Sequence, residues 1–312
     1  MDKKLDGYFI LYKEFATAEG KSPRTIEDNL ADVRGFAKFL GECTDITQIM
    51  AEDLRRYIRF LQIQPRYATH PTIKSRDRLL TADSIASYVR GIRSFWAWLL
   101  REGFITFNPF ALVKPPKLIE KSGEPLSPGE FTRLLKVIPA DGKNNRPDHS
   151  MVITLYGTGM RVSELVSLRL DGVNFETGQI TVTGKGNKQR ALFTSPVLFK
   201  ALFHYRYKIR PKADIALFFV TQFGRPINRF YVEHKLHDYG IQANIGRRIF
   251  PHILRYSFAI EFLRNGGDPF TLQQILGHSS LDMTRHYVRM ANTDVERSMK
   301  KFSPLEFLGK NK

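Results

Sequence analysis

The chain contains 312 residues, of which 48 are Lys or Arg and 31 are Asp or Glu, so its formal net charge at pH 7 is +17. This length predicts two domains of roughly 150 residues, each large enough to bury its own core. The lone Cys43 excludes an internal disulfide framework and a multi-cysteine metal site, and it fits a reducing cytoplasm. The longest strongly apolar run, Phe95 to Leu100, is too short to span a bilayer, and the polar N-terminus predicts no secretory signal.

The positive charge is unevenly distributed along the chain. Residues 1–120 hold 19 basic and 15 acidic side chains, whereas residues 121–312 hold 29 and 16, so the net charges are +4 and +13. Such an excess favours nucleic acid as a partner, because Lys and Arg neutralise phosphates and release condensed counterions. An anionic membrane surface is the weaker alternative, since no basic amphipathic helix with a broad apolar face is evident. A merely soluble basic protein is the third possibility.

Residues 1–112 are expected to form a helical domain. Ser22-Pro23 predicts a helix start, and apolar residues at three- and four-residue spacing continue until Gly41. A second helix is expected over 51–62, and a basic, proline-containing loop over 64–80. Either Thr81 or Asp83 then caps a long helix that runs to about residue 101.

A proline-rich segment, residues 113–123, is the best linker in the sequence, and residues 124–312 are expected to form the second domain. Ser127-Pro128 starts its first helix. Residues 179–183 and 189–193 predict a β-hairpin around a glycine-containing turn. The remaining pattern predicts a mainly α domain with a small antiparallel sheet, with helices over 196–208, 228–242, 252–264, 270–276, 281–290 and 293–301.

Four short strings carry residues suited to phosphate chemistry. Residues 157–165 read GTGMRVSEL and place Arg161 where a glycine turn meets a helix, while residues 184–188 read GKGNK and place Lys185 in a turn. Residues 251–255 read PHILR, so His252 and Arg255 share one helix face. Residues 276–280 read LGHSS, and Tyr287 follows nine residues after His278. Each string alone is weak, because surface arginines and core tyrosines are common. Their joint occurrence in this order is the specific signal.

With these strings in this order, the chain resembles the tyrosine recombinases, or phage integrase family, and is most like its Xer-type and transposon-borne members. The resemblance implies a SAM-like helical core-binding domain followed by a catalytic domain with the DNA breaking-rejoining enzyme fold. It also implies that the site-specific enzyme cleaves and rejoins DNA through a 3′-phosphotyrosyl intermediate, without metal, cofactor or ATP. Departures from the family pattern are the long loop over 64–80 and the wording around Tyr287.

The resemblance assigns a role to each of six residues. Tyr287 is the nucleophile, and it needs help because a phenol is only about 0.1% ionised at pH 7. Arg161 and Arg255 clamp the phosphate, and His278 donates a further hydrogen bond to it. Lys185 is the general acid for the leaving 5′-oxygen, and His252 is either a proton acceptor or a phosphate ligand.

Residues around these six have supporting or competing interpretations. Glu164 is expected either to orient an arginine or histidine of the site or to be an exposed helix carboxylate. Arg90 and Arg93 are expected either to contact DNA phosphates or to lie on a solvated helix face. Lys188 and Arg190 are predicted to contact the DNA backbone. Tyr256 is interpreted as a packing residue and His286 as peripheral. The pair His234 and His237 lacks a completing ligand, so no metal site is predicted.

The resemblance further implies four protomers on two double-stranded DNA sites, as a homotetramer or with a paralogue, and residues 292–312 as a docking tail. A cytoplasmic, nucleoid-associated location without membrane contact is expected. Two alternatives stay open at this point: a type IB topoisomerase-like relaxing enzyme, which shares the chemistry, and a non-catalytic DNA-binding regulator.

Overall fold

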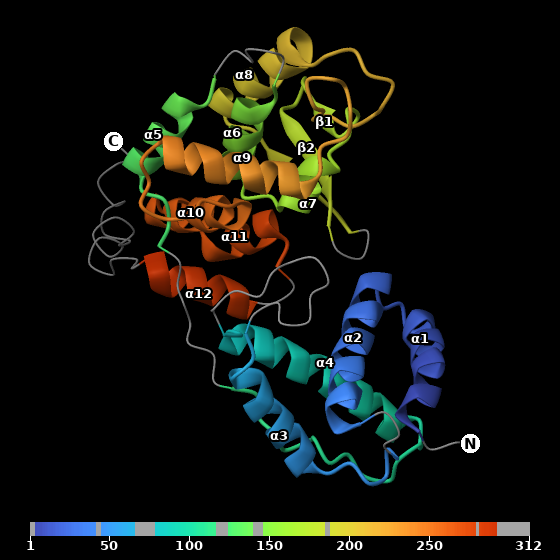
Figure 1. Cartoon of the computed structure of the whole chain (residues 1–312). Helices are drawn as coiled ribbons and strands as arrows, with labels where there is room; N and C mark the ends of the chain where they lie inside the picture. The colour runs from blue at the N-terminus through green and yellow to red at the C-terminus, as the bar shows by residue number, and fades with distance from the viewer. Residues whose placement is uncertain are drawn as a thin grey trace, which may run out of the picture. The chain divides into compact units, whose positions relative to one another are not determined.

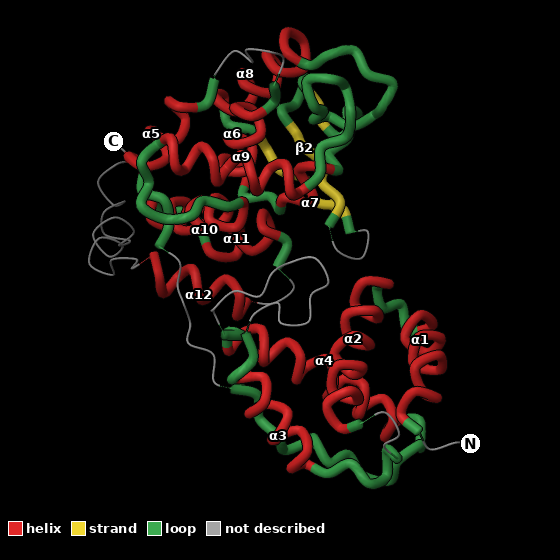
Figure 2. Tube along the Cα trace, in the orientation of Figure 1, coloured by secondary structure: helices red, strands yellow, loops and turns green. Residues whose placement is uncertain are grey.

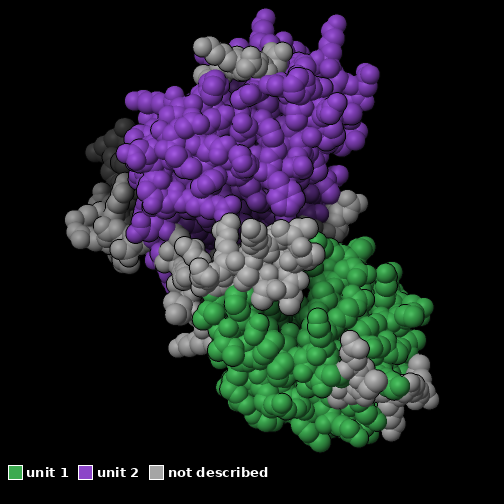
Figure 3. Space-filling model, viewed as in Figure 1, with its two compact units in different colours: residues 1–121 green, residues 122–312 purple. Residues whose placement is uncertain are grey.

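The computed structural model describes residues 4–41, 45–65, 79–116, 124–139, 146–184, 188–278 and 281–291. The chain forms two compact units, residues 1–121 and residues 122–312 (Figure 3). Most of the described residues are helical, and the strands among them belong to one small antiparallel sheet in the second unit (Figure 2). The predicted mainly α fold class is therefore confirmed. No helix in the described part of the chain is long and apolar enough to cross a membrane.

In the described residues of the first unit, the named elements are all helices. Ser22 caps its second helix by accepting a hydrogen bond from the backbone N–H of Thr25, and the helix ends before Gly41, whose φ is 94°. Thr81 caps the fourth helix in the same way, through the N–H of Ser84, so Thr81 rather than Asp83 is the cap. The elements in order are η1 (Leu5–Gly7), α1 (Tyr8–Ala18), α2 (Pro23–Leu40), α3 (Ala51–Gln62) and α4 (Ala82–Arg101).

Aromatic side chains fill the core of the first unit, where α2 packs along α4. Phe36 of α2, Trp96 of α4 and the following Phe110 are fully buried. The ring centroids of Trp96 and Phe110 lie 4.7 Å apart in a tilted arrangement, and Phe36 contacts both rings edge-on at 5.7–5.8 Å. The three- and four-residue spacing of apolar residues in the sequence places these rings on facing helix sides.

The second unit combines eight α-helices of the described chain with the sheet (Figure 1). Its last three helices pack against one another and carry most of the candidate site. The elements are α5 (Pro128–Val137), α6 (Asp148–Thr158), α7 (Val162–Val166), β1 (Val173–Asn174), β2 (Gln179–Thr183), β3 (Gln189–Phe193), α8 (Pro196–His204), the π-helical turn η3 (Tyr205–Ile209), α9 (Arg229–Gln242), α10 (Pro251–Arg264), α11 (Pro269–Leu276) and α12 (Leu281–Ala291).

The sheet has the strand order β1-β2-β3, with both neighbouring pairs antiparallel. Ile180 pairs with Leu192 and Val182 pairs with Arg190, and the three apolar members of these pairs are buried. The predicted hairpin is therefore confirmed with its bounds. β1, which the sequence did not indicate, adds a two-residue third strand beside β2.

Two helices were not predicted from the sequence, α1 and α6. Helix α6 is buried on nearly every side, including at the polar Thr154 and Thr158. It therefore lacks an exposed polar face, and its sequence does not show the alternation of polar and apolar residues every 3.6 positions that predicts a surface helix. The hydroxyl of each threonine donates a hydrogen bond of 2.6 Å to the backbone carbonyl four residues earlier. The helix expected over 293–301 and most of the loop over 64–80 lie outside the described residues.

Candidate active site

Arg161 lies at the start of α7, directly after a tight turn. Gly159 in this turn has a φ of 64°, and a Cβ added to it would lie 2.4 Å from a ring carbon of Phe258, so the turn requires glycine. The backbone N–H of Arg161 donates to Oε2 of Glu164 at 2.8 Å, and its Nη1 donates to Oε1 at 3.0 Å. Glu164 therefore orients the first arginine at the point where the helix begins.

Glu164 is 3% exposed, so the interpretation of this residue as a solvated helix carboxylate is wrong. Burial by itself would raise its pKa. Hydrogen bonds and positive charge from Arg190 and Arg161 outweigh that effect and hold the pKa of Glu164 below its ordinary value. The carboxylate is therefore ionised and serves both arginines.

Arg255 lies in α10 and is 3% exposed. Its Nη1 donates to the carbonyl of Gly159 at 2.7 Å, and its Nη2 donates to the carbonyl of Leu276 at 2.8 Å. Burial, followed by the positive charge of Arg161, lowers the pKa of Arg255 to about 10, which still leaves the guanidinium protonated at neutral pH. Arg255 thus joins the glycine turn before α7 to the end of α11.

The C-terminus of α11 is the place where the two arginines converge. Its last carbonyls have no helical partner and carry the negative end of the helix dipole. Arg161 donates to the carbonyls of Leu276 and Gly277, at 3.4 and 3.5 Å, and Arg255 shares the carbonyl of Leu276. Gly277 ends the helix in the left-handed conformation, with φ at 63°. This turn places the next residue, His278, beside Arg255.

His278 is buried between Arg255 and α12. Nη2 of Arg255 lies 3.1 Å from Nε2 of His278, and because a guanidinium only donates, Nε2 accepts. Nδ1 of His278 therefore carries the proton and donates to Oγ1 of Thr284 at 3.2 Å. Burial, then the charges of Arg255, Arg161 and Arg190, lower the pKa of His278 to about 4, so the ring is neutral at pH 7. Thr284 was not identified from the sequence, although it lies three residues before Tyr287 on the same helix.

Tyr287 is half-buried on α12 and stacks on His278, with ring centroids 5.7 Å apart and an interplanar angle of 12°. The ring of Tyr256 is also near Tyr287, with the two ring centroids 5.7 Å apart and tilted by 46°. Burial, and next the neighbouring Tyr287, raise the pKa of Tyr256. Its buried hydroxyl has no hydrogen-bond partner among the described residues. Tyr256 is therefore harder to ionise than a phenol in water.

His252 is the second residue of α10 and is exposed to solvent. Desolvation, then the positive charges of Arg255 and Arg161, lower the pKa of His252 below its ordinary 6.5. A neutral imidazole at pH 7 has a free lone pair and is able to take up a proton. His252 thus differs from the buried His278 in being open to solvent while facing the same two arginines.

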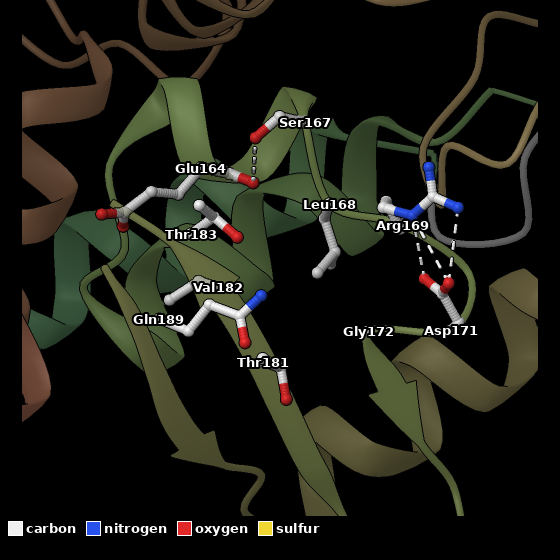
Figure 4. Close-up of a pocket in the computed structure, with 10 residues that line it drawn as sticks. All are labelled: Glu164, Ser167, Leu168, Arg169, Asp171, Gly172, Thr181, Val182, Thr183 and Gln189. Carbon is white, nitrogen blue, oxygen red and sulfur yellow. Dashed lines mark hydrogen bonds and ion pairs between the residues drawn. The ribbon is translucent and has the colours of Figure 1, made fainter. Parts of the chain in front are cut away.

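A cavity of about 270 Å³ lies beside Glu164, between the end of α7 and the sheet (Figure 4). Figure 4 shows Glu164 at one end of this cavity and the ion pair of Arg169 and Asp171 at the other. Thr181, Thr183 and Gln189 contribute polar groups from the strands.

The structure brings five of the predicted residues into one region: Arg161, Glu164, Arg255, His278 and Tyr287. His252 is electrostatically linked to the two arginines, and Lys185 lies outside the described residues. The catalytic roles of all six residues stay predictions.

The residues predicted to contact DNA differ from one another in the structure. Arg90 and Lys188 are exposed, and their predicted contacts are untested. Arg93 donates through Nη2 to the carbonyl of Ala111. Arg190 is only 14% exposed and binds Glu164, so its guanidinium is occupied by protein groups rather than presented to solvent.

Comparison with known proteins places this geometry in a family. The model of the phage integrase family matches residues 125–293. Tyrosine recombinase XerC of Pediococcus pentosaceus is 31% identical over 305 residues, covering 94% of this chain and 97% of that protein. Tyrosine recombinase XerD of Staphylococcus haemolyticus is 32% identical over 265 residues, covering 81% and 90%. The chain belongs to the phage integrase family. The tyrosine recombinase resemblance seen in the sequence is confirmed.

A solved structure also shares the fold of this tyrosine recombinase. The Tn1549 transposon integrase in complex with transposon right end DNA superposes with a TM-score of 0.72 at 20% identity, covering 94% of this chain and 98% of that one. The site geometry is compatible with the chemistry of the family. It offers two guanidiniums, a neutral histidine and a phenol around the end of one helix, which are groups suited to binding and attacking a phosphate.

Proposed function

We propose that this tyrosine recombinase cleaves and rejoins DNA at specific sites through a covalent bond between Tyr287 and a 3′-phosphate. The observation that carries the proposal is the convergence of Arg161, Arg255 and His278 on the C-terminal turn of α11, with the ring of Tyr287 stacked on His278. Family membership supports site-specific recombination as the activity.

In the proposed reaction, the phenolic oxygen of Tyr287 attacks the scissile phosphorus and the bond to the 5′-oxygen breaks. Arg161 and Arg255 neutralise the charge that grows on the non-bridging oxygens, and His278 adds a hydrogen bond. His252 accepts the proton of Tyr287, and Lys185 gives a proton to the leaving 5′-oxygen. The reverse sequence, with a 5′-hydroxyl from another strand as the attacking group, rejoins the DNA.

The proposed reaction requires neither a metal ion nor ATP. Two arginines and a lysine supply the positive charge that a divalent metal supplies in many nucleases. The phosphotyrosyl bond keeps the energy of the broken phosphodiester for the rejoining step. Cleavage is therefore expected to continue unchanged in excess EDTA, and a strict requirement for Mg²⁺ would contradict this part of the proposal.

We assign the two parts of the chain separate roles. Residues 1–112 form the core-binding domain, residues 113–123 the linker and residues 124–312 the catalytic domain, which act together on one duplex. Four protomers bind two DNA sites in the cytoplasm, as a homotetramer or with a paralogue, and residues 292–312 dock on a neighbouring protomer. Sedimentation on a DNA with two sites tests this assembly, by comparing the complex formed by the full chain with that formed by a variant truncated after residue 291.

A DNA substrate with a nick close to the cleavage point tests the cleavage activity. The short fragment that carries the released 5′-hydroxyl diffuses away, so the DNA cannot be rejoined and the covalent adduct accumulates. DNA that flanks the native gene supplies the candidate sites. We expect the wild-type protein and Tyr256→Phe to form the adduct and Tyr287→Phe to form none. Absence of an adduct with the wild-type protein would favour the non-catalytic regulator. If the wild-type protein forms the adduct and relaxes supercoiled DNA but never exchanges strands between two sites, the topoisomerase-like alternative is favoured.

A further inference from the structure

Arg190, on β3, uses its guanidinium in three hydrogen bonds to protein groups. Nη1 and Nη2 donate to the two oxygens of Glu164, each at 2.8 Å, and Nε donates to the carbonyl of Ile275 at 2.7 Å. The pair with Glu164 is bidentate, a geometry that only arginine provides. A buried bidentate pair holds both partners more firmly than a surface contact does.

The carboxylate of Glu164 connects Arg190 to Arg161. It receives Arg190 on one side and, on the other, both the backbone N–H and Nη1 of Arg161. Glu164 is 3% exposed, so water does not replace a lost partner easily. Removing Arg190 would leave Glu164 with Arg161 as its one cationic partner among the described contacts, and the arginine would be drawn toward the carboxylate instead of toward phosphate.

The carbonyl of Ile275 connects Arg190 to the turn that carries His278. Three arginines bind successive carbonyls at the end of α11: Arg190 binds that of Ile275, Arg255 that of Leu276, and Arg161 those of Leu276 and Gly277. The guanidinium of Arg190 also packs on Gly277, because a Cβ there would lie 3.3 Å from its Cδ and Nη1. Arg190 thus fixes the same turn that Arg161 and Arg255 share.

We propose that Arg190 is a positioning residue of the cleavage site, which holds Glu164 and the end of α11 so that Arg161 and His278 stay in place for the scissile phosphate. This inference rests on the proposed function of the site. It replaces the backbone-phosphate contact predicted from the sequence. Arg190 acts through Arg161 and His278 and does not itself touch the DNA.

Substitution of Arg190 by lysine separates the two roles, since lysine keeps the charge but cannot form the bidentate pair. Lys188, two residues earlier and exposed, is the matched control for a DNA contact. With saturating nicked DNA, we expect Arg190→Lys to lower the cleavage rate constant by about 10- to 100-fold, in line with a displaced transition-state donor. The salt dependence of its DNA affinity should equal that of the wild-type protein.

Lys188→Gln removes a charge that is predicted to contact DNA, so the magnitude of its slope of log affinity against log salt should fall by about one unit. A double-mutant cycle adds a readout that general destabilisation would not produce. In an Arg161→Ala background, Arg190→Lys should lower the rate by a smaller factor than it does in the wild-type background, because one of its two targets is already absent. If Arg190→Lys misfolds, as judged by its Tm, Glu164→Gln tests the same connection.

A normal cleavage rate constant in Arg190→Lys would overturn the proposal in favour of a phosphate contact, because the charge that lysine retains would preserve such a contact. The ring-nitrogen NMR signals of His278 in the free protein provide a readout that does not depend on activity. We expect them to shift in Arg190→Lys and to stay in place in Lys188→Gln. Unchanged signals in both variants would overturn the positioning role, whereas absence of an adduct with the wild-type protein would overturn the proposed function alone.

Discussion

The residues proposed to bind phosphate and those proposed to transfer protons are held differently in the candidate site. Arg161 and Arg255 are held by a carboxylate and by backbone carbonyls, and Arg255 is almost completely buried. By contrast, His252 is exposed at the first turn of α10, and Tyr287 is half-buried on α12. The first group is therefore organised before DNA arrives, whereas the second is accessible from solvent.

This difference fits the roles proposed for the two groups of residues. Stabilising a charged transition state works best when donors are fixed in advance, because no reorganisation is then needed during the reaction. Moving a proton requires a group that is able to exchange it, and solvent-accessible imidazole and phenol groups do so readily. The comparison predicts that substitutions in the first group affect both stability and rate, whereas substitutions in the second affect rate and its pH dependence.

The largest effect is expected for Arg255→Lys. Lysine cannot serve the carbonyls of Gly159 and Leu276 and the ring of His278 in one geometry, so the cleavage rate should fall by about 10²- to 10³-fold. The Tm should fall as well, because buried acceptors lose their donor. Arg161→Lys, whose side chain is 35% exposed, should lose a similar factor in rate with a smaller change in Tm. Equal changes in Tm for the two variants would contradict the view that the buried Arg255 contributes more to stability than the partly exposed Arg161.

The pH dependence of cleavage should report His252. Because the pKa of His252 is lowered below 6.5, the residue stays neutral at pH 7 and its lone pair is available for the proposed transfer of the proton from Tyr287. We expect single-turnover rates to be constant from pH 7 to 6.5 and to fall at more acidic pH, where the imidazole becomes protonated. His252→Gln should remove this acidic limb, and His286→Gln should retain it. An acidic limb that persists in His252→Gln would exclude His252 as the base.

Thr284 allows a sharper test of how His278 reaches phosphate. In the free protein Nε2 accepts from Arg255, so donation to phosphate from Nε2 requires the proton to move from Nδ1. A hydroxyl is able to accept from Nδ1–H in one state and to donate to Nδ1 in the other. Thr284→Val should therefore lower the rate by about tenfold, as expected for one displaced donor, and Thr284→Ser should retain it. Equal rates in Val and Ser variants would contradict this role.

The smallest effect is on stability at acidic pH. The pKa of His278 in the folded protein is about 4, against an ordinary 6.5. A lowered pKa of a basic group means that its stabilising contribution is present above pH 6.5 and is lost as the pH falls through 4. Relative to His278→Gln, the wild-type Tm should therefore decline by a few additional degrees between pH 6.5 and 4. Parallel declines in the two proteins would show that His278 is not buried.

Much of the fold was predictable because its signals are local. Ser22 and Thr81 cap helices through hydrogen bonds three residues away, and the alternation in β2 and β3 predicts their pairing. Helix α6 was missed because it is buried on almost all sides and lacks a polar face. β1 is only two residues long and depends on β2 for its conformation.

The site residues were found by the order of their motifs, whereas the connections between them were not. No local pattern shows that Arg190 binds Glu164, 26 residues away, rather than a DNA phosphate. The contact between Arg255 and the carbonyl of Gly159 spans 96 residues and depends on tertiary packing. Thr284 lies three residues before Tyr287, so the sequence places both on one face of a helix. Its contact with His278 is visible only in the structure.

The identity of the residue bound to DNA tests the central claim most directly. Trypsin digestion of the adduct trapped on nicked DNA separates the two phenols of the site, since cleavage after Arg285 and Arg289 releases residues 286–289 and cleavage after Arg255 and Arg264 releases residues 256–264. Mass spectrometry should find the nucleotide on the peptide that contains Tyr287, linked through a 3′-phosphate. A nucleotide on the peptide that contains Tyr256, or a 5′-linked adduct, would contradict the mechanism.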